Sequence, residues 1–144
     1  MTAHSDDTDG AAPTCKRGFG FHPLLGWSGC AATGVGESLG GMLRPGDSGS
    51  STTAGHIDCL EACLAALPCL PETVELMARA DTAGATHGFL SCLRQAKVGF
   101  STGLPVTADV RDAIRATPDS AWVPATRQNG EAREGAAVAE LTGR

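Results

Sequence analysis

The stretch from Val74 to Val106 constrains the fold most, because strand-like and helical patterns alternate within it at close spacing. The apolar run Val74–Asp81 predicts a strand that ends on a carboxylate. Small residues follow at Thr82–Thr86 and predict a tight turn. A helix is then expected to run through Lys97, and a further strand is expected over Val98–Val106.

The rest of the chain gives comparable signals. The other expected elements are strands at Gly18–Trp27 and Glu37–Leu43, joined as a hairpin by the glycine-rich turn Ser28–Gly36; a helix at Thr53–Leu67, capped by Thr52 or Thr53 and ended by Pro68; a helix at Ala108–Ala116, capped by Thr107; and strands at Ala121–Ala125 and Ala136–Leu141 around the turn signal Asn129-Gly130. The expected core residues are Ile57, Leu60, Leu64, Leu67, Phe89, Leu90, Leu93, Val110 and Ile114. This order of elements predicts an α/β or α+β fold.

Length and composition favour a globular protein. The 144 residues suit one domain, and 42% hydrophobic with 19% charged residues exclude wholesale disorder. No apolar run approaches the roughly 18 residues that a membrane span needs. The acidic, polar start of the chain does not resemble a signal peptide. We therefore expect a soluble cytoplasmic protein without a membrane partner.

The charge distribution is uneven. The net charge is -5, with most of the excess acid in residues 1–78, and this total argues against non-specific binding of nucleic acid. Lys16 and Arg17 stand beside Phe19 and Phe21, a combination that can contact a nucleic-acid backbone and its bases. Two cations are too few to define a binding surface.

Six cysteines raise the question of a metal or redox site. Without a secretion signal, reduced thiols are expected. Cys59 and Cys63 are spaced to share one helix face, and Cys69, Cys92, His56 and His87 are the candidates to complete a zinc site with them. The sequence favours the other interpretation, small apolar cysteines buried in the core. Cys15 and Cys30 complete the six.

Asp81 is the most informative residue for function. A carboxylate at the end of an apolar strand, followed at once by a turn and a helix, lies on the sheet rim where α/β proteins bind ligands. Hard cations such as Mg²⁺ prefer carboxylate oxygens. The alternative is that Asp81 merely caps the following helix through its side-chain oxygen.

The remaining polar groups give weaker signals. His22, before Pro23, is expected to be an extended packing or hydrogen-bonding residue, and His56 and His87 to be ordinary hydrogen-bonded histidines near helix starts. The run from Arg44 to Gly49 has the glycines of an anion cradle without a phosphate-loop pattern, so a solvated loop is expected. Asp6, Asp7 and Asp9 are expected to form a solvated acidic tail.

Four strings indicate a family: AHSDDTDGAAPTCKRGFGFHPLLGW, LGGMLRPGDSGSSTTAGHI, ARADTAGATHGFL and AWVPATRQNGEAREGAAVAELTG. Together they resemble bacterial insertion-sequence transposases of the DDE type, in order and over essentially the whole chain. The resemblance implies an RNase H-like core in which three carboxylates hold two divalent ions, here Mg²⁺, and DNA as substrate. Two such ions suit phosphodiester cleavage and strand transfer, since one activates the attacking oxygen and the other stabilises the leaving oxygen.

The resemblance assigns one acid of this triad to the chain. It makes Asp81, in the ARAD string, the second catalytic and metal-binding acid. The first acid would precede Met1 and the third would follow Arg144, and Glu131, Glu134 and Glu140 do not match the motif. We therefore expect an α/β (α+β) fold with an incomplete RNase H-like mixed sheet, flanking helices and no first central strand.

The expected organisation follows from this resemblance. Residues 1–17 form an irregular lead-in, residues 18–117 a partial catalytic core, and residues 118–144 the start of a β-rich insertion. Loss of a central strand leaves unpaired edges, so low stability or aggregation is expected.

The leading hypothesis is a transposase fragment that is inactive alone, since one carboxylate cannot assemble a two-metal site. The alternative is a non-enzymatic fragment that binds or inhibits a full-length transposase, and a homo-oligomer is a further expected assembly. A small cysteine-based zinc or redox protein is the third hypothesis.

Overall fold

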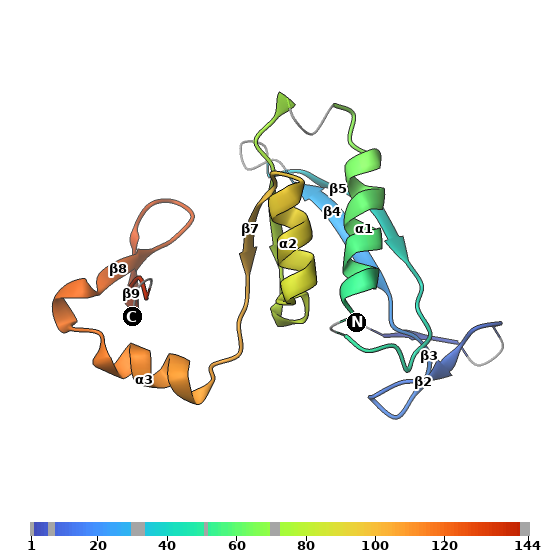
Figure 1. The fold of residues 1–144 in the computed structure, drawn as a ribbon, viewed down its shortest axis with the longest axis horizontal. Helices are drawn as coiled ribbons and strands as arrows, with labels where there is room; N and C mark the ends of the chain where they lie inside the picture. Colours follow the sequence, from blue (N-terminus) through green and yellow to red (C-terminus); the bar gives the residue numbers. More distant parts are fainter. Residues whose placement is uncertain (1, 6–7, 30–33, 51, 70–72, 142–144) are drawn as a thin grey trace. The chain divides into compact units, whose positions relative to one another are not determined.

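The computed structural model describes residues 2–5, 8–29, 34–50, 52–69 and 73–141, which form an α+β fold of short elements (Figure 1). The chain divides into two compact units, residues 1–104 and residues 105–144. The elements of the first unit are β1 (Ala3–His4), β2 (Ala12–Pro13), β3 (Phe19–Phe21), β4 (Leu24–Gly29), β5 (Gly36–Met42), α1 (Thr53–Ala65), β6 (Met77–Ala80), the 3₁₀ turn η2 (Thr82–Gly84), α2 (His87–Gln95) and β7 (Gly99–Thr102). Those of the second unit are α3 (Ala108–Ala116), the 3₁₀ turn η3 (Asp119–Ala121), β8 (Val123–Thr126) and β9 (Ala132–Val138).

The predicted strand–turn–helix–strand segment is present as β6, η2, α2 and β7. The strands β6 and β7 are parallel, as a helical crossover requires, with Ala80 opposite Thr102 at their carboxyl ends. Phe89 and Leu93 of α2 are 6% and 1% exposed and form the centre of the core with Val98. This confirms the predicted buried face of the helix.

Both strands of this unit are shorter than predicted. The strand expected over Val74–Asp81 begins at Met77, and the strand expected over Val98–Val106 ends at Thr102. Pro105 lies shortly after Thr102 and has no backbone N–H to continue the ladder. Asp81 therefore lies immediately beyond the ladder, at its carboxyl edge.

The predicted hairpin forms from β4 and β5, with Leu24 opposite Met42 and Gly29 opposite Gly36. The connecting turn includes residues 30–33, which lie outside the described residues. Helix α1 begins at Thr53, as predicted, but ends at Ala65, two residues before the predicted end at Leu67. The predicted cap is wrong, because the hydroxyls of Thr52 and Thr53 donate to Gly49 and Thr86 instead. A Cβ at Gly26 would lie 2.0 Å from Cys63 Sγ, so a glycine in β4 lets the helix approach the hairpin closely.

Two two-stranded sheets share one pair of packed helices. Around α1, Ala62 contacts Gly40 of β5, Cys63 contacts Gly26 of β4, and Leu60 and Leu64 pack toward α2. Because an α-helix has 3.6 residues per turn, Cys63 lies between Ala62 and the side of α1 that carries Leu60 and Leu64. The strand that Cys63 contacts, β4, is therefore nearer to α2 than β5 is. Among the described strands, β4 pairs with β5 and β6 pairs with β7, with no ladder between the two sheets.

The amino-terminal stretch is more ordered than predicted. Residues 1–17, expected to be irregular, contribute β1 and β2, which pair on either side of β3. The strand expected over Gly18–Trp27 is divided into β3 and β4, which belong to different sheets. The division falls at His22–Pro23, where Pro23 lacks a donor and the His22 N–H bonds instead to the Arg44 carbonyl oxygen at 2.8 Å.

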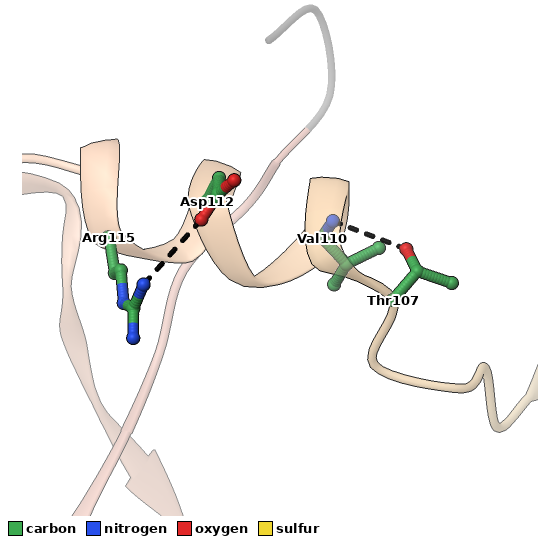
Figure 2. Close-up of polar contacts among 4 residues, drawn as sticks. All are labelled: Thr107, Val110, Asp112 and Arg115. Atoms are coloured by element: carbon green, nitrogen blue, oxygen red, sulfur yellow. Dashed lines mark hydrogen bonds and ion pairs between the residues drawn. The ribbon is translucent and has the colours of Figure 1, made fainter.

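The second unit is built from local interactions. Thr107 Oγ1 accepts a hydrogen bond from the Val110 N–H at 3.4 Å and caps α3 as predicted, and Asp112 and Arg115 form an exposed ion pair at 3.7 Å (Figure 2). The strands β8 and β9 pair antiparallel around Asn129-Gly130, with Gly130 at φ +85°, which confirms a hairpin at the predicted turn. Its second strand begins at Ala132, four residues before the predicted start at Ala136, and ends at Val138. In neither unit does a described helix have the length and apolar character needed to cross a membrane.

Candidate functional site at the end of β6

Asp81 lies one residue beyond β6, where the strand passes into η2. Its Oδ1 accepts a hydrogen bond from the Ala83 N–H at 3.0 Å, and its side chain is exposed. Asp81 therefore caps the 3₁₀ turn η2, whereas the helix it was predicted to cap as its alternative role, α2, is capped by Thr86. The bond from Ala83 occupies one carboxylate oxygen and fixes the carboxylate at the sheet rim.

Residues at the carboxyl end of β7 form hydrogen bonds with the turn that carries Asp81. Thr102 Oγ1 donates to the Asp81 carbonyl oxygen at 3.1 Å, and the Gly103 N–H donates to the Ala80 carbonyl oxygen at 3.3 Å. A Cβ at Gly103 would lie 3.0 Å from Thr82 Oγ1. Neither Thr102 nor Gly103 could be identified from the sequence, because their contacts with this turn depend on the parallel pairing of β6 and β7.

The buried side of the turn is equally crowded. A Cβ at Gly84 would lie 2.6 Å from the Ala80 Cβ, 3.6 Å from the Phe89 ring and 3.8 Å from the His56 ring. His56 is 7% exposed, its Nδ1 lies 2.9 Å from the Thr52 carbonyl oxygen, and its ring centroid is 5.3 Å from that of Phe89. The core of the first unit thus supports the turn that carries Asp81.

The site fits one carboxylate ligand to a hard cation and no complete metal centre. Across the described parts of the chain, no three His, Cys, Asp or Glu side chains come close enough to hold an ion together. Glu131, which does not match the triad motif, accepts a hydrogen bond from Asn129 Nδ2 at the β8–β9 turn. An ion bound here would therefore take one ligand from Asp81, and water or acids from elsewhere would fill its other positions.

The cysteines are divided between buried and exposed positions. Cys59 is 7% exposed and Cys63 is half-buried beside it, whereas Cys15 and Cys69 are exposed, so the prediction of buried cysteines is wrong for those two. Burial, together with the adjacent Cys63 thiol, raises the pKa of Cys59 to about 11 against a weaker opposing effect of Arg44. The thiol of Cys59 is therefore protonated near neutrality. Cys30 lies outside the described residues.

His22 behaves as predicted, since its Nδ1 lies 3.0 Å from the Ser48 carbonyl oxygen. His56 is also hydrogen-bonded as expected, and His87 is exposed at the first residue of α2.

The loop after β5 is packed and not simply solvated, contrary to the prediction. Arg44 Nε and Nη1 donate to the carbonyl oxygens of His22 and Gly49, both at 3.2 Å. Gly46 is buried, and a Cβ there would lie 2.3 Å from the Ala12 carbonyl oxygen. The loop therefore contacts both the small amino-terminal sheet, through Gly46, and the start of α1, where Arg44 lies beside Gly55.

The basic pair Lys16 and Arg17 forms part of the β2–β3 turn. Arg17 has φ +61°, and the turn is closed by hydrogen bonds from the Thr14 N–H to the Gly18 carbonyl oxygen and from the Arg17 N–H to the Thr14 carbonyl oxygen. Both basic side chains are exposed. Asp9 of the predicted acidic tail is exposed too, whereas Asp6 and Asp7 lie outside the described residues.

A shallow groove in the second unit completes the candidate sites. It has a volume of about 400 Å³ and runs beside β8 and β9, with a lining of Trp122, Val123, Pro124, Arg133, Gly135, Ala136 and Ala137. The sequence analysis did not predict it, since the lining residues meet only through the pairing of these strands.

The sequence matches the model of the family "Transposase DDE domain group 1" over residues 1–142, and the chain belongs to this family of DDE transposases. Membership implies a transposase-related function that uses divalent metal ions and acts on DNA. Neither the curated proteins nor the solved structures gave a match.

Proposed function

We propose that this chain is an incomplete catalytic core of a bacterial insertion-sequence transposase, and that Asp81 is one of the acids that bind its metal ions. In the complete enzyme the reaction is cleavage and transfer of DNA strands. The observation that carries the proposal is the exposed Asp81 carboxylate, which the Ala83 N–H holds just beyond the first strand of a parallel β–α–β unit. The family match over residues 1–142 supports it.

The same proposal gives the chain an RNase H-like core that lacks its first, central strand. The support is the pair of two-stranded sheets, β5–β4 and β6–β7, which have no ladder between them. The helices nevertheless connect the two sheets, because α1 packs against β4 and β5, α2 packs against β7, and the two helices pack against each other. A strand between β4 and β6 would join the two sheets. The core is proposed to cover residues 18–117, and the β8–β9 hairpin to begin a β-rich insertion over residues 118–144.

The proposed metal role concerns what the residues of this chain do. Mg²⁺ ions, when bound, supply activation of the attacking oxygen and stabilisation of the leaving oxygen. Asp81 would bind through the carboxylate, and the Ala83 N–H would orient that carboxylate by holding Oδ1. One carboxylate leaves each ion short of oxygen ligands, so the chain is proposed to be inactive alone.

A direct test combines a cleavage assay with a metal-binding measurement on the full chain. We expect no cleavage of DNA carrying transposon ends in Mg²⁺ or Mn²⁺, but selective Mn²⁺ broadening of the NMR signals around Asp81. Asp81→Asn should remove this broadening, whereas Asp119→Asn, at another exposed aspartate, should leave it intact. Cleavage that depends on Asp81 would disprove inactivity, and absence of broadening would disprove the metal role.

A second candidate function is inhibition of a full-length transposase by association. The unpaired edges of β4 and β6 favour it, because exposed strand edges are templates for pairing with another chain. The same edges would serve a homo-oligomer. Co-expression with a full-length family member should then yield a complex, and recovery of the two proteins separately would exclude this function.

A further inference from the structure

The carboxyl end of β7 holds the backbone of the Asp81 turn. Thr102 pairs with Ala80 at the last position of the parallel ladder, and its hydroxyl reaches past the ladder to the Asp81 carbonyl oxygen at 3.1 Å. The same hydroxyl lies 3.2 Å from the Gly103 carbonyl oxygen, so its proton is shared between two acceptors of which the Asp81 oxygen is the nearer.

The next residue of the chain restricts the turn from the same side. The Gly103 N–H donates to the Ala80 carbonyl oxygen, and the missing Cβ of Gly103 leaves room for Thr82. A Cβ at this position would approach the Thr82 N–H nitrogen to 3.3 Å as well as its hydroxyl to 3.0 Å. Thr102 and Gly103 therefore contact the two residues, Asp81 and Thr82, whose peptide begins η2.

We propose that Thr102 is a positioning residue for the Asp81 carboxylate. The bond from its hydroxyl fixes the Asp81–Thr82 peptide, and this peptide sets the direction of the Ala83 N–H that holds Oδ1. The carboxylate then meets a divalent ion in one orientation, without an ordering cost at binding. This inference rests on the proposed function, because it requires Asp81 to be a metal ligand.

The experiment measures Mn²⁺ affinity on the full chain through the paramagnetic broadening of the Ala83 and Gly84 amide signals. Thr102→Val removes the hydroxyl at nearly constant shape, and we expect it to weaken the affinity about tenfold, the lower end of the range for groups that orient a metal ligand. Thr102→Ser restores the donor and should restore the affinity of the unchanged chain.

Thr117→Val is the matched control, because Thr117 Oγ1 also donates to a backbone carbonyl oxygen, that of Ala113, at 2.8 Å. It lies in the second unit and should leave the Mn²⁺ affinity unchanged. If Thr102 only stabilised the fold, Thr102→Val would lower the melting temperature, and the Mn²⁺ affinity of the folded protein would stay the same.

The outcomes separate this inference from the proposed function. Absence of broadening in the unchanged chain overturns the proposed function and the inference with it. Broadening that Asp81→Asn abolishes, with equal affinity in the unchanged chain and Thr102→Val, overturns the inference alone. If Thr102→Val does not fold, Thr102→Ala replaces it, since it also removes the hydroxyl that donates to the Asp81 carbonyl oxygen; unchanged affinity in that variant also overturns the inference.

Discussion

The two units of this chain are stabilised in different ways. The buried apolar residues that the structure describes are Cys59, Phe89, Leu93 and Val98, and all belong to the first unit. In the described part of the second unit the buried residue is a polar one, Thr117, at 6% exposure. Hydrophobic burial therefore stabilises the first unit, and local hydrogen bonds account for the order of the second.

This difference has a functional counterpart. The turn that carries Asp81 rests on the core through Gly84, Phe89 and His56, so the candidate metal ligand is supported by the better-packed part of the chain. The second unit instead relies on the Thr107 cap and the Asn129-Gly130 turn. Rigid packing suits a residue that must present a ligand in one orientation.

The largest expected effect comes from Leu93→Ala. Removing this side chain, which is 1% exposed, should cost about 2–5 kcal/mol of the free energy of unfolding, because burial is lost and a cavity remains. The two tryptophans report the units separately, since Trp27 lies in β4 and Trp122 precedes β8. In a Trp122→Phe background, where Trp27 is the reporter, Leu93→Ala should lower the urea concentration at the midpoint of the unfolding transition.

The matched measurement uses Leu93→Ala in a Trp27→Phe background, where Trp122 is the reporter. Its transition is expected to stay where it is, because the buried residue described in the second unit, Thr117, bonds to Ala113 within that unit. Equal shifts of both tryptophan signals would show that the units unfold together, and the comparison above would be wrong.

A smaller effect is expected from pH. Because the pKa of Cys59 is raised from 9.0 to about 11 in the folded chain, the unfolded thiol ionises first as the pH rises. The stability that this thiol contributes is fully present below pH 9.0 and is lost between pH 9.0 and about 11. Melting curves followed by Trp27 should shift to lower temperature across this range.

Cys59→Ser should flatten the pH response of the first unit, while Cys69→Ser, at an exposed cysteine, should leave it unchanged. The second unit has no cysteine, so Trp122 provides an internal control. A pH response that persists in Cys59→Ser would assign it to another group.

Thr107→Ala should destabilise α3 by about 1 kcal/mol, because the helix loses the hydroxyl that accepts the Val110 N–H. Thr52→Ala provides the contrast, since the Thr52 hydroxyl donates to the Gly49 carbonyl oxygen and makes no cap bond to α1. Hydrogen exchange of the α3 amides should accelerate in Thr107→Ala, and the α1 amides of Thr52→Ala should keep their protection. Comparable losses in the two helices would mean that cap geometry does not set their stability.

The smallest effect is expected from Arg115→Ala. Its ion pair with Asp112 joins side chains that are 72% and 71% exposed, and water screens such a pair strongly (Figure 2). Protection of the α3 amides should therefore match that of the unchanged chain at both low and high salt. A salt-dependent loss would identify the pair as a real contribution to the second unit.

Most elements of this fold could be predicted from the sequence because their signals are local. The helix cap at Thr107, the buried face of α2 and the Asn129-Gly130 turn each depend on residues a few positions apart. The placement of β3 and β4 in different sheets could not be predicted, since it depends on contacts with distant residues such as the bond between His22 and Arg44. The same limit applies to β1 and β2, whose two-residue ladders form only against β3.

By itself, the sequence determined the class of the fold, the position of Asp81 after a strand and the resemblance to DDE transposases, which the family match supports. These properties follow from periodicity, turn residues and motif order along the chain. Only the tertiary structure decided what surrounds Asp81, because Thr102, Gly103 and His56 reach its turn from other elements. It also revealed that β4–β5 and β6–β7 remain separate sheets, since strand pairing is settled by contacts between distant segments.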